Sequence, residues 1–239
     1  MRATRVPAAI PDRDARLAEG AMLLVDKPKG WTSFDVVNKI RGLLHVRRVG
    51  HAGTLDPMAT GLLIVCTGRK TREIDQFVGL DKEYEAELLL GGRTASFDAE
   101  TPVEDQRSIE GITEERVCEV FAQFVGLQQQ IPPMWSAVKV KGKPLYAYAR
   151  KGIEVERKPR DVNIASIVLT GIDLPRVSFT VTCSKGTYVR ALVNDIGLSL
   201  GCGAYLTALR RTRIGTFVLG DAQTIDQLSL ACRDAGGGQ

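Results

Sequence analysis

Residues 50–61 read GHAGTLDPMATG, and the chain continues to residue 69 as LLIVCTGR. The first segment surrounds one carboxylate, Asp56, with three glycines, a proline and His51. Glycine allows a positive φ and a close approach of the backbone to a ligand, and Pro57 stiffens the chain after the acid. The short apolar run that follows is typical of a buried strand. We therefore expect a stiff loop that presents Asp56 as a nucleophile or base, with an ordinary Asp-Pro turn as the alternative.

The residues before this loop predict a strand and a helix. The strand is expected over 22–25 and is followed by a Pro-Gly turn. Thr32, with Asp35 three residues further on, resembles a capping box at the start of a helix. Helical spacing predicts an apolar stripe on that helix, made of Phe34, Val37, Ile40 and Leu44.

The residues after the loop predict more strands than helices, and the strands often follow one another directly. Strands are expected over 82–91, 136–142, 162–173, 176–186 and 212–220, and helices over 71–79, 113–126 and 187–201. This pattern favours an α+β fold with a mixed, mostly antiparallel sheet flanked by helices and loops. We expect one catalytic domain over 21–230, a flexible lead-in over 1–20 and a flexible tail over 231–239.

The composition of the 239 residues is that of a globular protein, with 44% hydrophobic and 25% charged residues. No apolar run is long enough for a membrane span, and the first twenty residues lack the apolar core of a signal peptide. Five widely spaced cysteines without a CxxC pair, and only two histidines, argue against a disulfide framework or a zinc site. We therefore expect a cytoplasmic protein without a bound metal.

Charge is unevenly distributed along the chain although the net charge is only +4. Residues 139–160 carry eight basic residues against Glu154 and Glu156, and residues 39–52 carry four basic residues and no acid. Residues 81–115 hold eleven acids against three bases. Basic blocks of this kind suit a polyanionic partner, and solvated faces that balance one another are the alternative.

Five segments resemble, in order, the motifs of the TruB family of tRNA pseudouridine synthases. They are LLVDKPKGWTS (23–33), GHAGTLDPMATGLL (50–63), DKEYEAELLLG (81–91), CSKGTYVRALVNDIG (183–197) and YLTALRRTRIG (205–215). The resemblance extends from about residue 22 to residue 228. It implies the pseudouridine-synthase fold, an enzyme that converts uridine 55 in the T-loop of tRNA to pseudouridine, and chemistry without a cofactor. The implied partner is the tRNA T-stem-loop, with no membrane, no obligatory protein partner and a monomeric state.

The resemblance also assigns catalytic roles to three residues. Asp56 matches the catalytic aspartate, which either attacks the sugar carbon or removes a sugar proton. Arg190 matches the arginine that pairs with this aspartate, and a nearby guanidinium favours the ionised carboxylate. Tyr84 matches a tyrosine on which the extruded base stacks and which lies where the C5 proton leaves. An ordinary helix-surface arginine and a core tyrosine are the alternatives.

Further residues match positions that bind the nucleotide or the RNA. His51 is expected to hold the flipped nucleotide, and Tyr188 and Leu209 to line the uracil pocket; structural or core roles are the alternatives. Lys27 is expected to hold the aspartate loop, to contact RNA or simply to be solvated. Phosphate contacts are expected from seven basic residues, namely Arg47, Arg48, Lys139, Lys141, Lys143, Arg150 and Lys151.

Other functions and one departure from the family stay open at this point. Many bacterial members carry a further C-terminal RNA-binding domain, which we expect to be absent because the chain stops soon after residue 228. That absence disfavours the catalytic subunit of a guide-RNA pseudouridylation particle. The remaining alternatives are an RNA-binding or tRNA-folding protein without catalysis and a hydrolase that releases free uracil.

Overall fold

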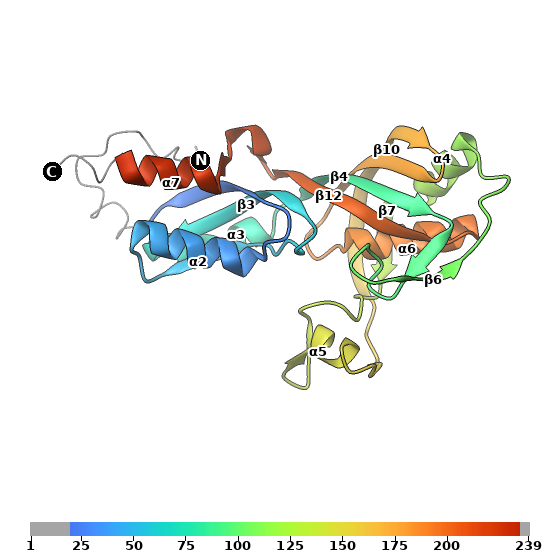
Figure 1. Cartoon of the computed structure of the whole chain (residues 1–239), viewed down its shortest axis with the longest axis horizontal. Helices are drawn as coiled ribbons and strands as arrows, with labels where there is room; N and C mark the ends of the chain where they lie inside the picture. The colour runs from blue at the N-terminus through green and yellow to red at the C-terminus, as the bar shows by residue number, and fades with distance from the viewer. Residues whose placement is uncertain (1–19, 235–239) are drawn as a thin grey trace. The chain divides into compact units, whose positions relative to one another are not determined.

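A computed structural model of the chain describes residues 20–234. Residues 1–19, which make up nearly all of the expected lead-in, and residues 235–239 of the expected tail lie outside the described residues. Within the described part the chain forms two compact units, residues 20–84 with 209–234 (unit 1) and residues 85–208 (unit 2). Strands β4 (Lys82–Leu90) and β12 (Ala204–Ile214) contribute residues to both units (Figure 1). The expectation of a single catalytic domain over 21–230 stays a prediction.

The sheet of unit 1 combines parallel and antiparallel pairs. The strand β1 (Met22–Lys27) pairs antiparallel with β3 (Thr60–Thr67). The pairs β1 with β14 (Gln223–Thr224) and β3 with β12 are parallel. Two further strands join antiparallel, β2 (Val49–Ala52) on β3 and β13 (Phe217–Val218) on β12.

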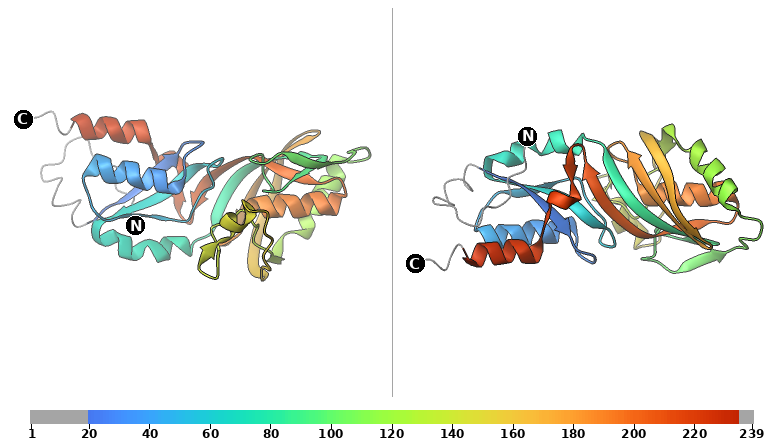
Figure 2. Two further views of the ribbon diagram at one scale, coloured as in Figure 1. Left: turned by 60° about the horizontal axis from the view of Figure 1, so that its bottom comes forward. Right: turned by 90° about the horizontal axis from the view of Figure 1, so that it is seen from above.

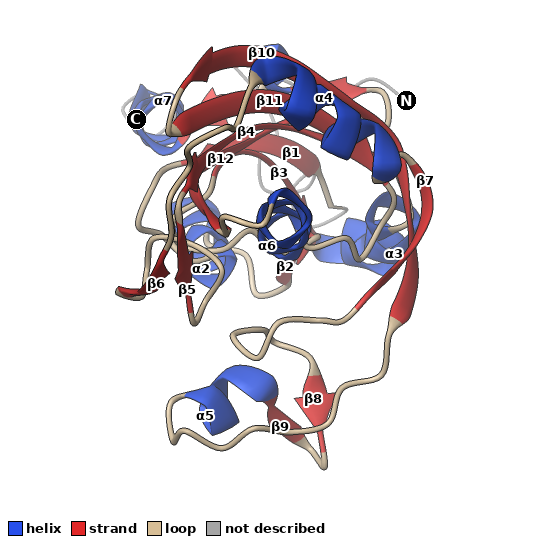
Figure 3. Cartoon of the chain, turned by 90° about the vertical axis from the view of Figure 1, so that its right-hand side faces the viewer, coloured by secondary structure: helices blue, strands red, loops and turns tan. Residues whose placement is uncertain are grey.

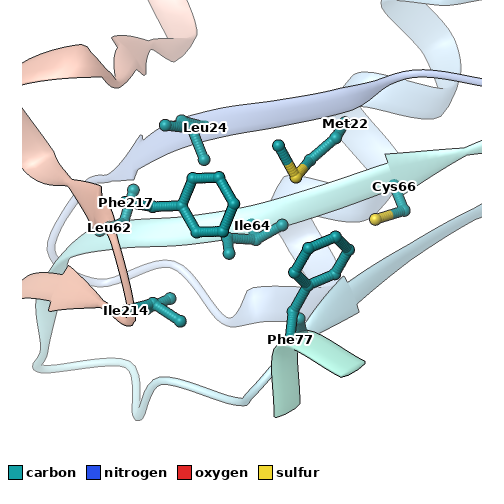
Figure 4. Packing of buried hydrophobic residues seen from close by; sticks show 9 residues of the cluster. Met22, Leu24, Leu62, Ile64, Cys66, Phe77, Ile214 and Phe217 are labelled. Atoms are coloured by element: carbon teal, nitrogen blue, oxygen red, sulfur yellow. The ribbon is translucent and has the colours of Figure 1, made fainter. Parts of the chain in front are cut away.

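Two hydrophobic clusters cover the two faces of this sheet because successive side chains of a strand point to opposite faces. Leu23 and Val25 of β1 pack with helices α2 (Ser33–Leu44) and α7 (Ile225–Asp234). Met22 and Leu24 pack on the other face with Phe77 of helix α3 (Ile74–Val78), as Figure 4 shows. Figure 2 shows α2 and α7 on one side of the strands and α3 on the other. A 3-10 helix, Gly68–Glu73, precedes α3, so the stretch predicted as one helix over 71–79 holds the last residues of the 3-10 helix and all of α3.

Cys66 of β3 belongs to the cluster with Phe77 and is fully buried. Burial raises the pKa of this thiol to about 11, because an apolar environment disfavours the charged thiolate. All five cysteines are free in the structure.

Helix α2 begins at the predicted capping box, but one residue of its predicted apolar stripe does not face the core. Thr32 accepts a hydrogen bond from the Asp35 N–H, and the Asp35 carboxylate accepts one from the Thr32 N–H, which completes the capping box. The prediction that Phe34 faces the core is wrong, since the residue is 62% exposed. Val36 is buried instead, because the helix turns Ser33 and Val36 toward the protein.

Unit 2 contains strands of the same ten-stranded sheet, with two helices packed against them. The strand order is β12, β4, β11 (Arg176–Cys183), β10 (Arg160–Asp173) and β7 (Gly126–Gln130). The strands curve around α6 (Val189–Leu200), and α4 (Glu114–Gln123) packs beside it (Figure 3). Strand β4 forms within the predicted range and alternates, with Tyr84, Ala86 and Leu88 buried and glutamates between them. Strands β5 (Gly92–Thr94) and β6 (Val103–Gln106) form a separate hairpin.

A small subdomain projects from unit 2 between β7 and β10. It contains the hairpin of β8 (Lys139–Val140) and β9 (Lys143–Pro144) and the short helix α5 (Leu145–Ala149) (Figure 3). Of the strand predicted over 136–142, only the two residues of β8 are extended, and they form the first strand of this hairpin. Leu145 is fully buried and is the apolar centre of this subdomain.

The predicted α+β class with a mixed, largely antiparallel sheet is confirmed. Two boundaries differ from the prediction. Strand β12 begins at Ala204, eight residues before the predicted start at residue 212, because its alternating residues were not recognised as a strand. Helix α7 extends to Asp234, four residues into the segment predicted as a tail.

Candidate active site

Asp56 lies half-buried in the loop between β2 and β3 in unit 1. Its carbonyl accepts a hydrogen bond from the Ala59 N–H at 3.1 Å, which closes a turn directly after the acid. Gly53 and Gly61 flank the loop with φ values of 84° and 100°, where a side chain would be strained. The expectation that glycine is required for positive φ is therefore confirmed at these two positions.

The two neighbours of Asp56 are both fixed to the protein by hydrogen bonds. The hydroxyl of Ser33, at the start of α2, accepts a bond from the Leu55 N–H at 2.9 Å and lies 3.3 Å from the Leu55 carbonyl oxygen. The Pro57 carbonyl accepts a bond from the Gly30 N–H at 2.8 Å. Because the residues before and after Asp56 are held in this way, the backbone at the acid has little freedom.

Lys27, at the end of β1, is a buried support of the same loop. Its side chain is fully buried, and its ammonium donates to the carbonyls of Pro28 (3.0 Å), Trp31 (2.6 Å) and Pro57 (3.4 Å). Of the three roles considered for Lys27, the geometry favours the one that holds the loop. The RNA-contact and solvated roles are corrected here, because the ammonium is enclosed by carbonyl groups and does not face solvent.

His51 lies on β2, paired with Val65 of β3, and is only partly exposed. Its pKa is lowered from the ordinary 6.5, first because burial disfavours the imidazolium and second because the positive Arg211 repels it. Its buried Nδ1 has no hydrogen-bond partner among residues 20–234. The lowered pKa favours the neutral ring, which lies on the strand that leads into the Asp56 loop.

Tyr84 and Leu209 lie on strands β4 and β12 of unit 1, and both are largely buried. The guanidinium carbon of Arg211 lies 6.0 Å from the centre of the Tyr84 ring, in cation–π range. Arg211 also donates to the Gly53 carbonyl at 3.1 Å and to the Leu62 carbonyl at 2.7 Å. Arg211 thus connects the Asp56 loop with the tyrosine, a role that the sequence did not suggest.

Arg190 is the second residue of α6 in unit 2 and is buried, which excludes the helix-surface alternative. One of its terminal nitrogens lies 3.7 Å from a carboxylate oxygen of Asp98, which is fully buried, and 3.5 Å from the Ser96 carbonyl oxygen. The other Asp98 oxygen accepts bonds from the Ser96 hydroxyl at 2.5 Å and the Glu100 N–H at 3.0 Å. A buried arginine beside a hydrogen-bonded carboxylate is held in one orientation.

Tyr188 precedes Arg190 at the N-cap of α6 and is partly exposed. Its backbone is fixed by the buried Gln130, which accepts from the Tyr188 N–H at 2.8 Å and donates to its carbonyl at 3.1 Å. The Arg190 guanidinium lies 5.7 Å from the centre of the Tyr188 ring. The two predicted residues in this part of unit 2 are therefore neighbours.

The seven basic residues predicted to contact RNA are all exposed. Arg47 and Arg48 lie in the loop between α2 and β2 of unit 1. Lys139, Lys141, Lys143, Arg150 and Lys151 lie on or beside the β8–β9 hairpin and α5 of unit 2. The guanidinium of Arg150 stacks 5.5 Å from the ring of the exposed Tyr146, so that the subdomain offers an aromatic group among its charges.

The structure thus groups the predicted residues within each unit. Asp56, His51, Tyr84 and Leu209 belong to unit 1, and Tyr188 and Arg190 belong to unit 2. The predicted pairing of Asp56 with Arg190 stays a prediction. Sequence reasoning assigned no role to Ser33, Asp98 and Arg211, although Ser33 lies in the first of the matched motifs and Arg211 in the fifth.

Residues 20–234 hold no helix whose length and apolar character would let it span a membrane. They also hold no group of three or more histidine, cysteine, aspartate or glutamate side chains arranged to hold a metal ion.

Comparison with known families defines the class of protein to which this fold and these residues belong. Residues 41–189 match the family described as "TruB family pseudouridylate synthase (N terminal domain)". Residues 190–235 match the "tRNA pseudouridylate synthase B C-terminal domain". The chain belongs to the TruB family of pseudouridylate synthases, which are isomerases that act on uridine in RNA.

Within this family the chain is similar to curated proteins named tRNA pseudouridine synthase B. The protein of Chloroherpeton thalassium is 50% identical over 217 residues, which are 88% of this chain and 89% of that protein. The protein of Opitutus terrae is 50% identical over 207 residues, 87% of this chain and 86% of its own. The protein of Burkholderia pseudomallei is 49% identical over 220 residues, 92% of this chain and 72% of its own.

Solved structures with the same fold come from larger assemblies. A chain of a Cbf5-Nop10-Gar1 complex superposes with a TM-score of 0.72 at 30% identity over 95% of this chain and 61% of its own length. A chain of an H/ACA RNP bound to a substrate RNA containing 2'-deoxyuridine gives a TM-score of 0.67 at 28% identity over 90% of this chain and 54% of its own. The present chain therefore spans less than two thirds of those chains, and the fold that it shares with them is confirmed.

Proposed function

We propose that this protein isomerises uridine 55 in the T-loop of tRNA to pseudouridine. The bond from N1 of uracil to C1′ of the ribose breaks, the base turns while it is held, and C5 bonds to C1′. The proton on C5 leaves and N1 gains one, so that the atoms balance without an external reactant. The target base must leave its stack to reach a side chain, which costs a few kcal/mol that protein contacts have to offset.

The fixed backbone around Asp56 is the observation that carries this proposal. A carboxylate that acts beside the ribose needs a defined position, and the loop is held on both sides of Asp56 by Ser33, Gly30 and Lys27. A turn that only reverses the chain does not need a buried ammonium and a buried serine as supports. The supports therefore favour a catalytic loop over an ordinary Asp-Pro turn.

We assign the following roles to the other predicted residues. Tyr84 and Leu209 are largely buried strand residues that contribute to the uracil pocket, and the Tyr84 hydroxyl takes part in removal of the C5 proton. Arg190, held against Asp98, orients the carboxylate of Asp56 and keeps it ionised. His51 and Tyr188 contact the flipped nucleotide. The seven exposed basic residues contact phosphates.

The choice of tRNA as substrate is supported by relatives named tRNA pseudouridine synthase B at 49–50% identity. Identity to the Cbf5 chain is lower, at 30%. We accordingly propose a cytoplasmic monomer that binds the T-stem-loop without an obligatory protein partner. A tRNA-folding role can accompany this activity, because binding and extrusion of the base open the T-loop.

Tritium release tests the activity directly. The protein is incubated with unmodified tRNA that carries tritium at C5 of uridine, and the tritium that enters water is counted. We expect release by the parental protein and none by Asp56→Asn, with tRNA binding retained. Asp75→Asn, a matched change on the exposed side of α3, is expected to release tritium at the parental rate.

Each alternative predicts a different result in the same assay. Equal release by the parental protein and Asp56→Asn contradicts the role of the carboxylate. Binding without any release by the parental protein indicates an RNA-binding protein without catalysis. Free uracil in the chromatogram of the products indicates a hydrolase.

A further inference from the structure

We propose that Arg211 is a positioning residue that holds the Asp56 loop and the Tyr84 ring in their catalytic arrangement. The inference rests on the proposed function and adds a residue to which no role has been assigned. Arg211 lies on β12, and all of its contacts used here are within unit 1.

The burial of Arg211 requires an explanation. It is 1% exposed and belongs to the largest fully buried side chains of the described structure. A guanidinium keeps its charge at every pH that a protein experiences, so that burial cannot be relieved by loss of a proton. Removing such an ion from water costs several kcal/mol unless its hydrogen bonds are replaced. A residue of this kind is retained where its contacts do something that a hydrophobic residue cannot do.

The hydrogen bonds of Arg211 reach both ends of the Asp56 loop. Its terminal Nη2 donates to the Gly53 carbonyl at 3.1 Å, three residues before Asp56. Its Nε donates to the Leu62 carbonyl at 2.7 Å, at the start of the buried part of β3. One rigid group therefore spans the segment that contains the catalytic acid and fixes the distance between its ends.

The backbone of Arg211 is equally close to this segment. Arg211 pairs with Gly61 where β12 and β3 run parallel. A side chain at Gly61 would place its Cβ only 2.4 Å from the Arg211 carbonyl oxygen, so only glycine fits. The main chain and the side chain of Arg211 thus hold the loop from two directions.

The flat face of the Arg211 guanidinium lies over the ring of Tyr84 on β4. Its carbon lies 6.0 Å from the centre of the Tyr84 ring, within the range of a stabilising cation–π contact. The planar face and the two edge N–H groups are used at the same time. A lysine ammonium can supply the charge but not this combination of directions.

The charge of Arg211 is not neutralised by an ion pair within the described residues. Its polar contacts are the two carbonyls, and the neighbouring His51 is disfavoured from becoming a second cation beside it. Arg211 therefore holds a permanent positive charge against the Asp56 loop. Such a charge favours the ionised form of a nearby carboxylate.

Single-turnover tritium release separates positioning from stability. The full-length protein is mixed in saturating excess with a T-stem-loop RNA that carries tritium at C5 of uridine. RNA affinity and thermal unfolding are measured in parallel. We expect Arg211→Gln to lower the rate constant of the folded protein on the order of 10²-fold, because small displacements of reacting groups have effects of that size. Arg211→Lys is expected to lose about tenfold, and affinity is expected to stay within about threefold for both.

A matched control lies two residues further along the same strand. Arg213 is partly exposed and pairs with Glu83 at 3.0 Å and with the Gly215 carbonyl at 3.1 Å. Arg213→Gln removes the same chemical group from β12 and is expected to keep the parental rate constant.

The outcomes are distinct. A folded Arg211→Gln protein with a rate constant within about twofold of the parental value overturns the inference, as does a loss that appears only in RNA affinity. If Arg211→Gln does not fold, Arg211→Lys decides, and a parental rate in that variant also overturns it. A parental protein that releases no tritium contradicts the proposed function instead and leaves this inference without its premise.

Discussion

The loop around Asp56 and the subdomain around α5 are both predicted to meet RNA, and they are built in opposite ways. The loop is tied to three separate elements through Lys27, Ser33 and Arg211, and these supporting groups are buried. The subdomain carries its lysines on an exposed hairpin, and its own contacts are local, such as the Tyr146 N–H to the Ser136 carbonyl.

This difference agrees with the physical demands of the two tasks. Chemistry on a sugar–base bond needs a carboxylate fixed to within a fraction of an ångström, so buried supports are favoured. Phosphate binding needs charge that reaches a flexible polyanion, and its strength depends on the number of contacts more than on their exact geometry. If this distinction holds, changes at the supports of the Asp56 loop and changes in the subdomain around α5 affect different measurements.

The largest effect is expected from Lys27→Met. The change leaves the carbonyls of Pro28, Trp31 and Pro57 without their charged donor, and a buried group without its partner costs about 1–3 kcal/mol. We expect the free energy of unfolding to fall by about that amount, measured by urea denaturation. Lys29→Met, at an exposed position two residues away, is the control and is expected to change little. Equal stability of both variants would contradict the role of Lys27 as a support.

Ser33→Ala tests the loop itself with a smaller change. The variant loses the hydrogen bond to Leu55, which contributes about 0.5–1.5 kcal/mol, and lets the residue before Asp56 move. We expect the rate of tritium release to fall on the order of tenfold, with RNA affinity unchanged. Ser108→Ala, at an exposed serine of unit 2, serves as the control. Loss of affinity without loss of rate would assign Ser33 to RNA binding.

The subdomain around α5 is tested by replacing Lys139, Lys141 and Lys143 with glutamine together. Each phosphate contact to a single strand contributes about 0.7 to the slope of log affinity against log salt concentration. The slope is expected to fall by about 2 for three contacts, while turnover at saturating RNA stays at the parental value. Arg116→Gln on the exposed face of α4 is the control. Reduced turnover at saturation would show that this subdomain also positions the substrate.

Arg47 and Arg48 provide a smaller version of the same test within unit 1. Their replacement by alanine removes two exposed charges close to β2 and is expected to flatten the salt slope by about 1.4. Turnover at saturating RNA should change little. An unaltered slope is evidence that neither arginine contacts phosphate.

The smallest effect concerns pH. The pKa of His51 is lowered in the folded protein, so the unfolded chain binds more protons between that value and the ordinary 6.5. Stability contributed by neutral His51 is present above about pH 6.5 and is lost as pH falls through the folded pKa. Urea denaturation across this range should show a weaker pH dependence in His51→Gln. His45→Gln at the exposed end of α2 is the control, and an equal effect in both variants would contradict the assignment.

Local patterns in the sequence were sufficient for much of the fold. The capping box at Thr32 and the strand expected over 82–91 are each decided by neighbours within a few residues, and each is confirmed. Phe34 was misassigned because helical spacing alone does not say which of two adjacent stripes faces the sheet. The early start of β12 was missed because polar residues alternate through it.

The supports of the site could not be predicted in the same way. Arg211 and Asp98 are charged residues in buried positions, and composition or periodicity assigns such residues to the surface. The partners of Arg211 are also distant in the sequence: Gly53 lies 158 residues from it. Asp56 itself could be singled out, since the glycines and proline that shape its loop are its immediate neighbours.

The reactivity of the Cys66 thiol can report on the opening of the core of unit 1. With a pKa of about 11, roughly one thiol in 10,000 is ionised at pH 7, and the side chain has no access to solvent. Alkylating reagents and mild oxidants therefore reach this sulfur only when the strand β3 separates from its neighbours. The rate of its labelling would time the opening of the strand that leads out of the Asp56 loop, without an introduced cysteine.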